Sequence, residues 1–208
     1  PPGTSGMSAH LQTHLELILA KFPVICYQDD VLIYTFKGQN HATIVSQVID
    51  TLTAHNIRMN VEKSTPKLVQ KTVTFVGRKI DSQTIQPDPQ SIQALSNISL
   101  PTHTKQLHSF LGSLSWHRDF LKNLSQKIQP LYNILTRYNS QSNHKIVWTQ
   151  PEIKCFNAIK EWLTHKLQIN LPDLSKGFII QTDASTLGLG ATLLQDSDEG
   201  LVLIAAAS

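Results

Sequence analysis

The 208-residue sequence is poor in cysteine and in charge, and it has no long apolar run. It contains two cysteines, and Asp, Glu, Lys and Arg make up only 16% of its residues, against roughly 25% in an ordinary globular domain. The longest apolar run, residues 201–207, is far shorter than the roughly 18 residues that identify a membrane-spanning helix. The sequence therefore predicts a globular chain with no membrane partner.

The scarcity of cysteine also excludes several kinds of site. Cys26 and Cys155 are far apart and lie in apolar contexts, so we expect neither a disulfide framework nor a cysteine-rich metal site. This usage is typical of a reducing, intracellular compartment. The first residue is Pro1 rather than Met, and no charged-then-apolar secretory signal follows it. We therefore expect the chain to be a fragment of a longer protein.

The small net charge of +3 is unevenly distributed along the chain. Residues 58–147 contain twelve Lys and Arg against four Asp and Glu, whereas the remainder contains six against eleven. Clustered Lys and Arg give sequence-independent, salt-dependent affinity for phosphates. The central block therefore predicts a nucleic-acid partner, and the two flanks are acidic.

The hydrophobic periodicity predicts an α+β fold. Spacing of three and four residues indicates helices over residues 8–19, 42–54, 89–98, 104–114 and 126–138, and another that opens after Trp148. Residues 22–27 and 31–36 are typical of a β-hairpin, and residues 71–81 alternate as one strand with Gly77 at a kink or close approach. Three further strands, near residues 177–182, 190–195 and 201–207, indicate an antiparallel meander.

Asp29 and Asp30 are adjacent carboxylates between two apolar strands. Like charges in a partly desolvated site repel each other, so the adjacent placement of these two carboxylates is electrostatically costly. One interpretation is an exposed hairpin turn, in which Asp is a common residue. The other is a site for a hard cation such as Mg²⁺, which carboxylate oxygens bind well. Both interpretations stay open from these two residues alone.

A collinear series of motifs along the chain bears on how Asp29 and Asp30 are interpreted. The segment Tyr27-Gln28-Asp29-Asp30 resembles the Tyr-x-Asp-Asp box of reverse transcriptases, and the opening residues resemble the Pro-Phe-Gly box before it, with Pro2 in place of Phe. The downstream similarities are Asn56-Ile57 to Lys63, Phe75-Val76-Gly77-Arg78, Gln86-Pro87-Asp88-Pro89, Phe110-Leu111-Gly112, Gln129-Pro130-Leu131, Leu171-Pro172-Asp173 and Thr182-Asp183-Ala184-Ser185. The chain thus resembles the Pol polyprotein of gypsy-type or retrovirus-like retroelements. Its fold is expected to include an incomplete palm, a helical thumb and connection, and the first strands of a ribonuclease H-like mixed sheet.

The resemblance implies roles for individual residues. Asp29 and Asp30 would hold Mg²⁺, with Mn²⁺ as the alternative, in a two-metal polymerase site. Nucleotide or primer–template contacts are expected from seven residues: Gly3, Gln12, Tyr27, Gln28, Lys63, Phe75 and Gly77. Read without the family, Gly3 is a loop glycine, Tyr27 and Phe75 are core aromatics, and Lys63 lies on a solvated face.

The resemblance extends to the basic block and the C-terminal strands. Lys105, Arg118, Lys122 and Lys127 are expected to contact the nucleic-acid backbone, whereas Trp116 and Tyr132 have the spacing of packing residues. His103, His108 and His117 lack metal-ligand spacing and are expected at the surface or at caps. Asp183 would be a metal ligand of the ribonuclease H site; its alternative is a strand-end acid at a turn.

The implied partners are an RNA template, a DNA primer, an RNA–DNA hybrid, dNTPs and the remainder of the polyprotein. The implied domains are a partial palm over residues 1–82, thumb and connection helices over 83–147, and a connection helix with truncated ribonuclease H over 148–208. Because the family's other metal-binding acids lie outside this sequence, we expect the isolated chain to be catalytically inactive. The competing hypotheses are a decayed or domesticated nucleic-acid-binding remnant and another palm-type enzyme, such as a cyclase.

Overall fold

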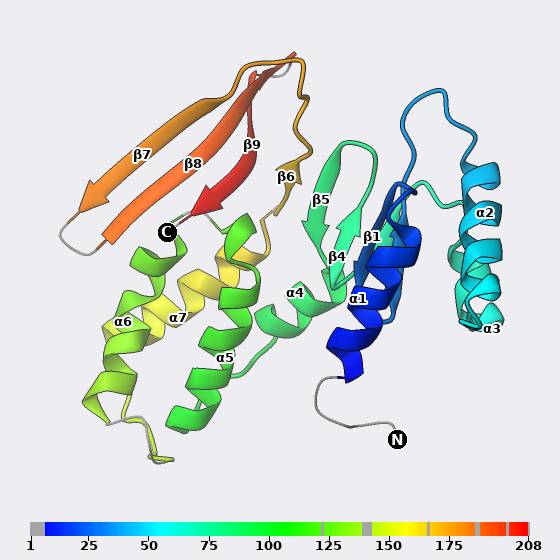
Figure 1. The fold of residues 1–208 in the computed structure, drawn as a ribbon. Helices are drawn as coiled ribbons and strands as arrows, with labels where there is room; N and C mark the ends of the chain where they lie inside the picture. The colour runs from blue at the N-terminus through cyan, green and yellow to red at the C-terminus, as the bar shows by residue number, and fades with distance from the viewer. Residues whose placement is uncertain are drawn as a thin grey trace. The chain divides into compact units, whose positions relative to one another are not determined.

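The computed structural model describes residues 7–121, 123–138, 143–165, 167–185, 188–198 and 200–207. It divides into two compact units, which meet in sequence between Val76 and Gly77. Each unit is described by itself below (Figure 1).

The first unit is a small α/β arrangement. Its elements are α1 (Met7–Leu19), β1 (Val24–Tyr27), β2 (Asp30–Ile33), α2 (His41–Ala54), α3 (Val61–Ser64), the 3₁₀ turn η1 (Thr65–Lys67) and β3 (Val73–Phe75). Strands β1 and β2 form an antiparallel hairpin. Its core consists of Leu15, Leu19, Val48 and Leu52, against which apolar residues of both strands pack. Helices α1 and α2 therefore bury the inner face of the hairpin.

The second unit has a larger helical core. Its helices are α4 (Pro89–Ser96), α5 (Thr104–Trp116), α6 (Leu124–Arg137) and α7 (Gln150–Leu163), with the 3₁₀ turn η2 (Arg118–Phe120) after α5. The start of α7 carries a capping box between Thr149 and Glu152 and an early proline, the features that stabilise a helix N-terminus. The core cluster holds fifteen buried residues, including Phe110 and Phe156, whose ring centroids are 5.0 Å apart.

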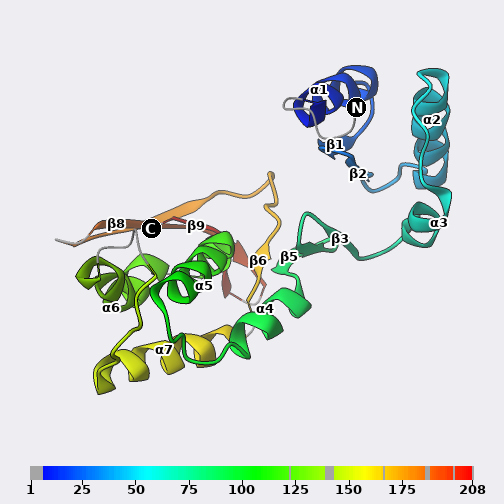
Figure 2. The same cartoon turned by 90° about the horizontal axis from the view of Figure 1, so that it is seen from below.

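Two antiparallel arrays of strands complete the second unit. Strands β4 (Arg78–Ile80), β5 (Thr84–Pro87) and β6 (Ile169–Asn170) pair in that order. Strands β7 (Ile179–Ser185), β8 (Gly188–Ser197) and β9 (Gly200–Ala207) form a meander with a bulge between Leu193 and Leu194. In Figure 2 the helices α5, α6 and α7 lie on one side of this meander.

A buried amide holds the segment that leads into β7. The Gln195 side chain accepts a hydrogen bond from the Asp173 backbone N–H at 2.8 Å and donates to the Asp173 carbonyl at 2.8 Å. It also donates to the Lys176 and Gly177 carbonyls at 3.3 and 3.4 Å. Because an unpaired buried amide is costly, this network explains how a side chain that is only 2% exposed can be polar.

The structure confirms the predicted α+β fold and the positions of the main elements, adds the short elements α3, η1, β5 and β6, and differs at one predicted strand. Residues 71–81 were expected to form a single strand, but the structure has β3 and β4 with a turn at Val76 and Gly77, whose φ angles are +47° and +67°. Positive φ at two successive residues is the geometry of a type I′ turn. The three domain boundaries proposed from the sequence remain predictions.

Candidate functional site

The two predicted metal-binding carboxylates lie at the tip of the β1–β2 hairpin. Tyr27 pairs with Asp30, so Gln28 and Asp29 form a two-residue loop. Gln28 has a φ of +54°, a left-handed conformation that costs a non-glycine residue about 1–2 kcal/mol. Asp29 and Asp30 are both exposed, as is Tyr27, at 44%. The hairpin tip thus presents Asp29 in the loop and Asp30 at the start of β2 to solvent, next to a residue with positive φ.

A side chain from α1 holds this strained loop. The Gln28 backbone N–H donates to Gln12 Oε1 at 3.3 Å, and Gln12 Nε2 donates to Glu16 Oε1 at 2.9 Å. The structure therefore brings three predicted site residues, Gln12, Gln28 and Asp29, to one place. In the described chain Gln12 supports the loop backbone; its predicted contact with nucleotide or template remains a prediction.

The chemistry of the hairpin tip fits a hard cation. The described residues form two ion pairs, Arg78–Asp119 and Arg137–Glu152, and neither involves Asp29 or Asp30. Within the same residues there is no group of three or more His, Cys, Asp or Glu side chains that could hold a metal. Two carboxylates suit Mg²⁺, because that ion keeps several waters and commonly takes one or two carboxylates together with substrate phosphates.

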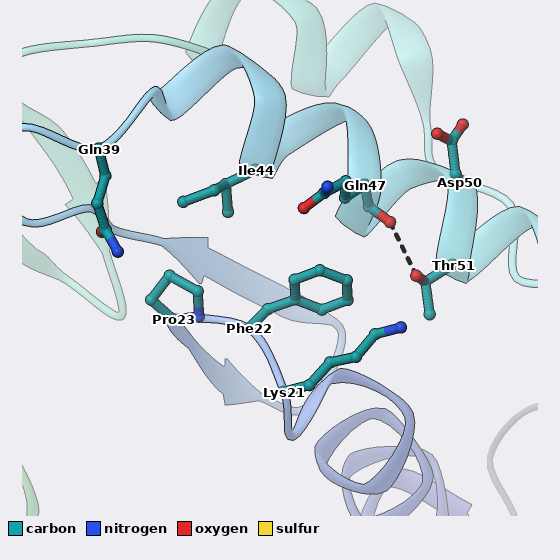
Figure 3. Close-up of a pocket in the computed structure, with 8 residues that line it drawn as sticks. All are labelled: Lys21, Phe22, Pro23, Gln39, Ile44, Gln47, Asp50 and Thr51. Atoms are coloured by element: carbon teal, nitrogen blue, oxygen red, sulfur yellow. Dashed lines mark hydrogen bonds between the residues drawn. The ribbon is translucent and has the colours of Figure 1, made fainter.

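The first unit also contains a hollow of about 620 Å³ at the other end of the hairpin. Phe22 and Pro23 precede β1, whereas the acids follow its last residue, so this hollow is separate from the tip. Figure 3 shows Lys21 beside Phe22, with its Nζ 5.0 Å from the ring centroid. The remaining lining comes from α2 and the loop before it: Gln39, Ile44, Gln47, Asp50 and Thr51.

Lys63, a predicted nucleotide contact, lies in α3 and is exposed. Its backbone N–H donates to Asn60 Oδ1 at 3.1 Å. No described contact joins Lys63 to the hairpin tip. The predicted contact Gly3 lies outside the described residues.

Phe75 and Gly77, the predicted primer contacts, flank the type I′ turn. Phe75 is partly buried at the end of β3. A Cβ added to Gly77 would lie 3.7 Å from Trp116 Nε1, and the Gly77 carbonyl accepts a hydrogen bond from the Asp88 N–H at 3.0 Å. Glycine readily adopts this positive φ, and an added Cβ would be at ordinary van der Waals distance from the indole, so the structure shows a turn at Gly77 rather than a close approach. The predicted primer contacts of Phe75 and Gly77 remain predictions.

Helix α5 has an exposed face that the hydrophobic periodicity of the sequence did not predict. Lys105, His108, Gly112 and Trp116 recur every three or four residues and are all exposed, Trp116 at 54%. A Cβ at Gly112 would meet no atom within 4 Å. Trp116 was expected to pack in the core, and that expectation was wrong, as was the same expectation for Tyr132, which is 39% exposed. Smaller residues fill the core side of α5, which leaves the indole outside.

The other predicted backbone-binding cations have mixed surroundings. Arg118 is exposed in η2, and Lys105 is exposed at the start of α5. Lys127 is also exposed, with its Nζ 4.8 Å from the Trp162 ring centroid, a cation–π distance. Lys122 lies outside the described residues. Their contacts with nucleic acid stay predictions.

His117, expected at the surface or at a cap, is only 4% exposed. Its backbone N–H donates to the last turn of α5, so the capping expectation is correct and the surface expectation is wrong. Burial lowers the pKa of the imidazole, and the nearby Arg78 charge lowers it further, against an opposing contribution from Asp88. His117 therefore resists protonation in the folded chain.

Asp183 lies in β7, opposite Gly190 of β8. Its side chain is exposed, as a strand carboxylate must be to bind a hydrated ion. The strands of this meander are the ones predicted from the sequence. The structure thus presents the third predicted metal-binding carboxylate to solvent, in the second unit.

Comparisons with known proteins define the class. Residues 148–208 match the family model described as the RNase H-like domain found in reverse transcriptase. The whole chain aligns with the foamy viral protease–reverse transcriptase in complex with dsDNA, with a TM-score of 0.82, 24% identity and 42% of that chain covered. Its complex with RNA/DNA hybrid gives a TM-score of 0.77 at 24% identity and 27% coverage. The fold is therefore that of part of a reverse transcriptase.

The relatives in sequence are transposon polyproteins. The chain is 30% identical over 202 residues to the Transposon Tf2-3 and Tf2-7 polyproteins of Schizosaccharomyces pombe, an alignment that covers 96% of this chain. The chain spans 15% of the length of these relatives. The resemblance to the reverse transcriptase region of a retroelement polyprotein, predicted from the motifs, is confirmed.

Proposed function

We propose that this chain contributes to RNA-directed DNA synthesis by binding a template–primer duplex and presenting Asp29 and Asp30 to a divalent metal. The observation that carries the proposal is the hairpin tip, where Asp29 in the two-residue loop and Asp30 at the start of β2 are both exposed and Gln12 of α1 braces the loop backbone. Positive φ is usual in two-residue hairpin loops, so the support for the proposal comes from the two adjacent exposed acids and from the contact of the loop with Gln12.

The chemistry assigned to the tip is nucleotidyl transfer. Asp29 and Asp30 would hold Mg²⁺, which when bound activates a primer 3′-hydroxyl and balances the charge of a dNTP triphosphate. Tyr27 and Gln28 would face the primer end and the incoming nucleotide. Asp183, by the same argument, would hold a metal for cleavage of the RNA strand of an RNA–DNA hybrid.

The duplex would contact the exposed face of α5 and the adjoining turn. Lys105 provides a positive charge for phosphates, and Gly112 allows a close approach of the helix backbone. Trp116 adds a flat apolar surface beside Gly77. A surface with these properties suits a duplex read by its shape and backbone, which is how proteins recognise A-form helices.

Binding of labelled duplexes to the 208-residue chain tests the interface. We expect fluorescence anisotropy to show binding to an RNA–DNA hybrid, with affinity that falls steeply as salt rises. Trp116→Ala and Lys105→Ala should each weaken it, whereas Lys154→Ala, an exposed lysine on α7, serves as the control. Affinity that does not change with salt would contradict the proposal.

Paramagnetic broadening by Mn²⁺ tests the metal site without any turnover. We expect low concentrations of Mn²⁺ to broaden the backbone amide signals of residues 27–31, and Asp29→Asn with Asp30→Asn to abolish that broadening. Glu62→Gln changes an exposed acid elsewhere in the first unit and should leave it intact. Duplex binding without broadening at the tip would instead favour a non-catalytic nucleic-acid-binding module.

A further inference from the structure

The junction between β4 and the end of α5 contains a polar clasp in the second unit. Arg78 Nη2 lies 2.7 Å from Asp119 Oδ2, and the Arg78 guanidinium lies 5.3 Å from the Phe120 ring centroid. Both side chains of the ion pair are partly shielded, at 30% and 40% exposure. The guanidinium thus makes two contacts with η2 at once. We call Arg78, Asp119 and Phe120 the clasp.

The clasp lies next to two parts of the proposed duplex surface. Arg78 directly follows Gly77 of the type I′ turn, and Asp119 and Phe120 come three and four residues after Trp116. Gly77 and the Trp116 indole are neighbours, as described above. A contact between Arg78 and η2 therefore holds Gly77 near the C-terminal end of α5.

We propose that the Arg78–Asp119 pair is a positioning element that keeps Gly77 and Trp116, both in the second unit, in one continuous surface for the duplex. This inference rests on the proposed function for its purpose, although the clasp itself is independent of ligand. Arg78 acts through Gly77 and Trp116 rather than through a phosphate contact of its own. Its guanidinium is occupied by a carboxylate and an aromatic ring, which supports this assignment.

Removal of the acid distinguishes positioning from a direct phosphate contact. If Arg78 simply bound phosphate, Asp119→Ala would free its charge and strengthen duplex binding. If the clasp positions the surface, Asp119→Ala and Arg78→Ala should both weaken binding, by roughly five- to tenfold, as expected for coupled residues. The exchanged pair, Arg78→Asp with Asp119→Arg, should restore affinity to within about threefold by the same coupling argument.

The second ion pair provides a matched control. Arg137 Nη1 lies 3.0 Å from Glu152 Oε1, between α6 and α7 in the same unit. Arg137→Ala removes the same charge and breaks an ion pair in the same unit while leaving the clasp intact, so it reports the effect of losing a cation away from the clasp. A loss of affinity in Arg137→Ala equal to that in Arg78→Ala, or a gain in Asp119→Ala, would overturn the positioning role.

A measurement without nucleic acid separates this inference from the proposed function. The indole N–H signal of Trp116 in a ¹H–¹⁵N spectrum, assigned with Trp116→Phe, reports the environment beside Gly77. It should shift or broaden in Arg78→Ala and Asp119→Ala and stay unchanged in Arg137→Ala. An unchanged signal in both clasp variants would reject the clasp, whereas failure of the unaltered chain to bind any duplex would reject the proposed function only.

Discussion

The hairpin tip and the clasp show two ways of holding functional groups in place. The tip belongs to the first unit, whose core cluster has four buried residues among those described, and a side-chain hydrogen bond from Gln12 braces its loop. The clasp belongs to the second unit, whose core cluster has fifteen, and an ion pair and a ring contact act there together. The difference suggests that the first unit tolerates local rearrangement at its acids, whereas the second presents a fixed surface.

The largest expected effect is the loss of stability of the second unit when a core side chain is truncated. Phe110→Ala should lower its free energy of unfolding by about 3–5 kcal/mol, because it removes a buried aromatic ring and leaves a cavity. Trp116, Trp148 and Trp162 all lie in this unit, so denaturant unfolding followed by tryptophan fluorescence measures it directly. Ser109→Ala, on the exposed side of the same helix, should change little. An equal loss in both variants would mean that Phe110 is not a core residue.

A smaller effect is expected at the turn beside the clasp. Gly77→Ala places a Cβ on a residue with φ of +67°, at a cost of about 1–2 kcal/mol in the left-handed region. Gly177→Ala is a suitable control, since a Cβ there meets no atom within 4 Å and no positive φ is recorded for it. The same fluorescence measurement compares the two. Equal stability of the variants would contradict the turn geometry.

At the hairpin tip a substitution should stabilise the chain. Gln28→Gly relieves about 1–2 kcal/mol of left-handed strain and adds about 0.5–1 kcal/mol of unfolded-state entropy, so a net gain of about 0.5–1 kcal/mol is expected. Hydrogen exchange of the β1 and β2 amides measures local stability in the first unit. Asp29→Gly adds the same entropy at a neighbouring position without a recorded positive φ. Asp29→Gly should reduce the protection of these amides from hydrogen exchange. Increased protection in Asp29→Gly as well would show that relief of backbone strain does not cause the stabilisation in Gln28→Gly.

The smallest effect is a pH dependence beside the clasp. The pKa of His117 is lowered in the folded chain by burial and by Arg78, so the unfolded chain binds a proton first as the pH falls. Stability should therefore decline as pH drops below the unfolded value of about 6.5. His117→Gln should flatten that decline between pH 6.5 and 5, measured by unfolding midpoints. The exposed His108→Gln should not, and identical profiles for all three chains would refute the assignment.

The sequence predicted those features that depend on local pattern. The two short apolar runs on either side of Asp29 and Asp30 correctly indicated a hairpin, and proline-led helical periodicity located α4 and α7. The Gln12–Gln28 contact is long-range, and no local pattern encodes it. The turn at Val76 was missed because a β-branched residue rarely adopts positive φ. Trp116 was misassigned because periodicity ranks a large aromatic as core, although the core side of α5 was already filled by Leu107, Phe110, Leu111 and Leu114.

The meander that carries Asp183 has a consequence for handling the protein. Strand β7 ends the order β7–β8–β9, so its outer edge has no partner strand among the described residues, and Ile180 is 69% exposed. Such an edge is a template for strand addition by another molecule. We expect the negative charge of Asp183 to oppose self-association at this edge. Asp183→Asn, a natural choice for removing a metal ligand, should therefore lower solubility as well, which light scattering against Asp183→Glu would reveal.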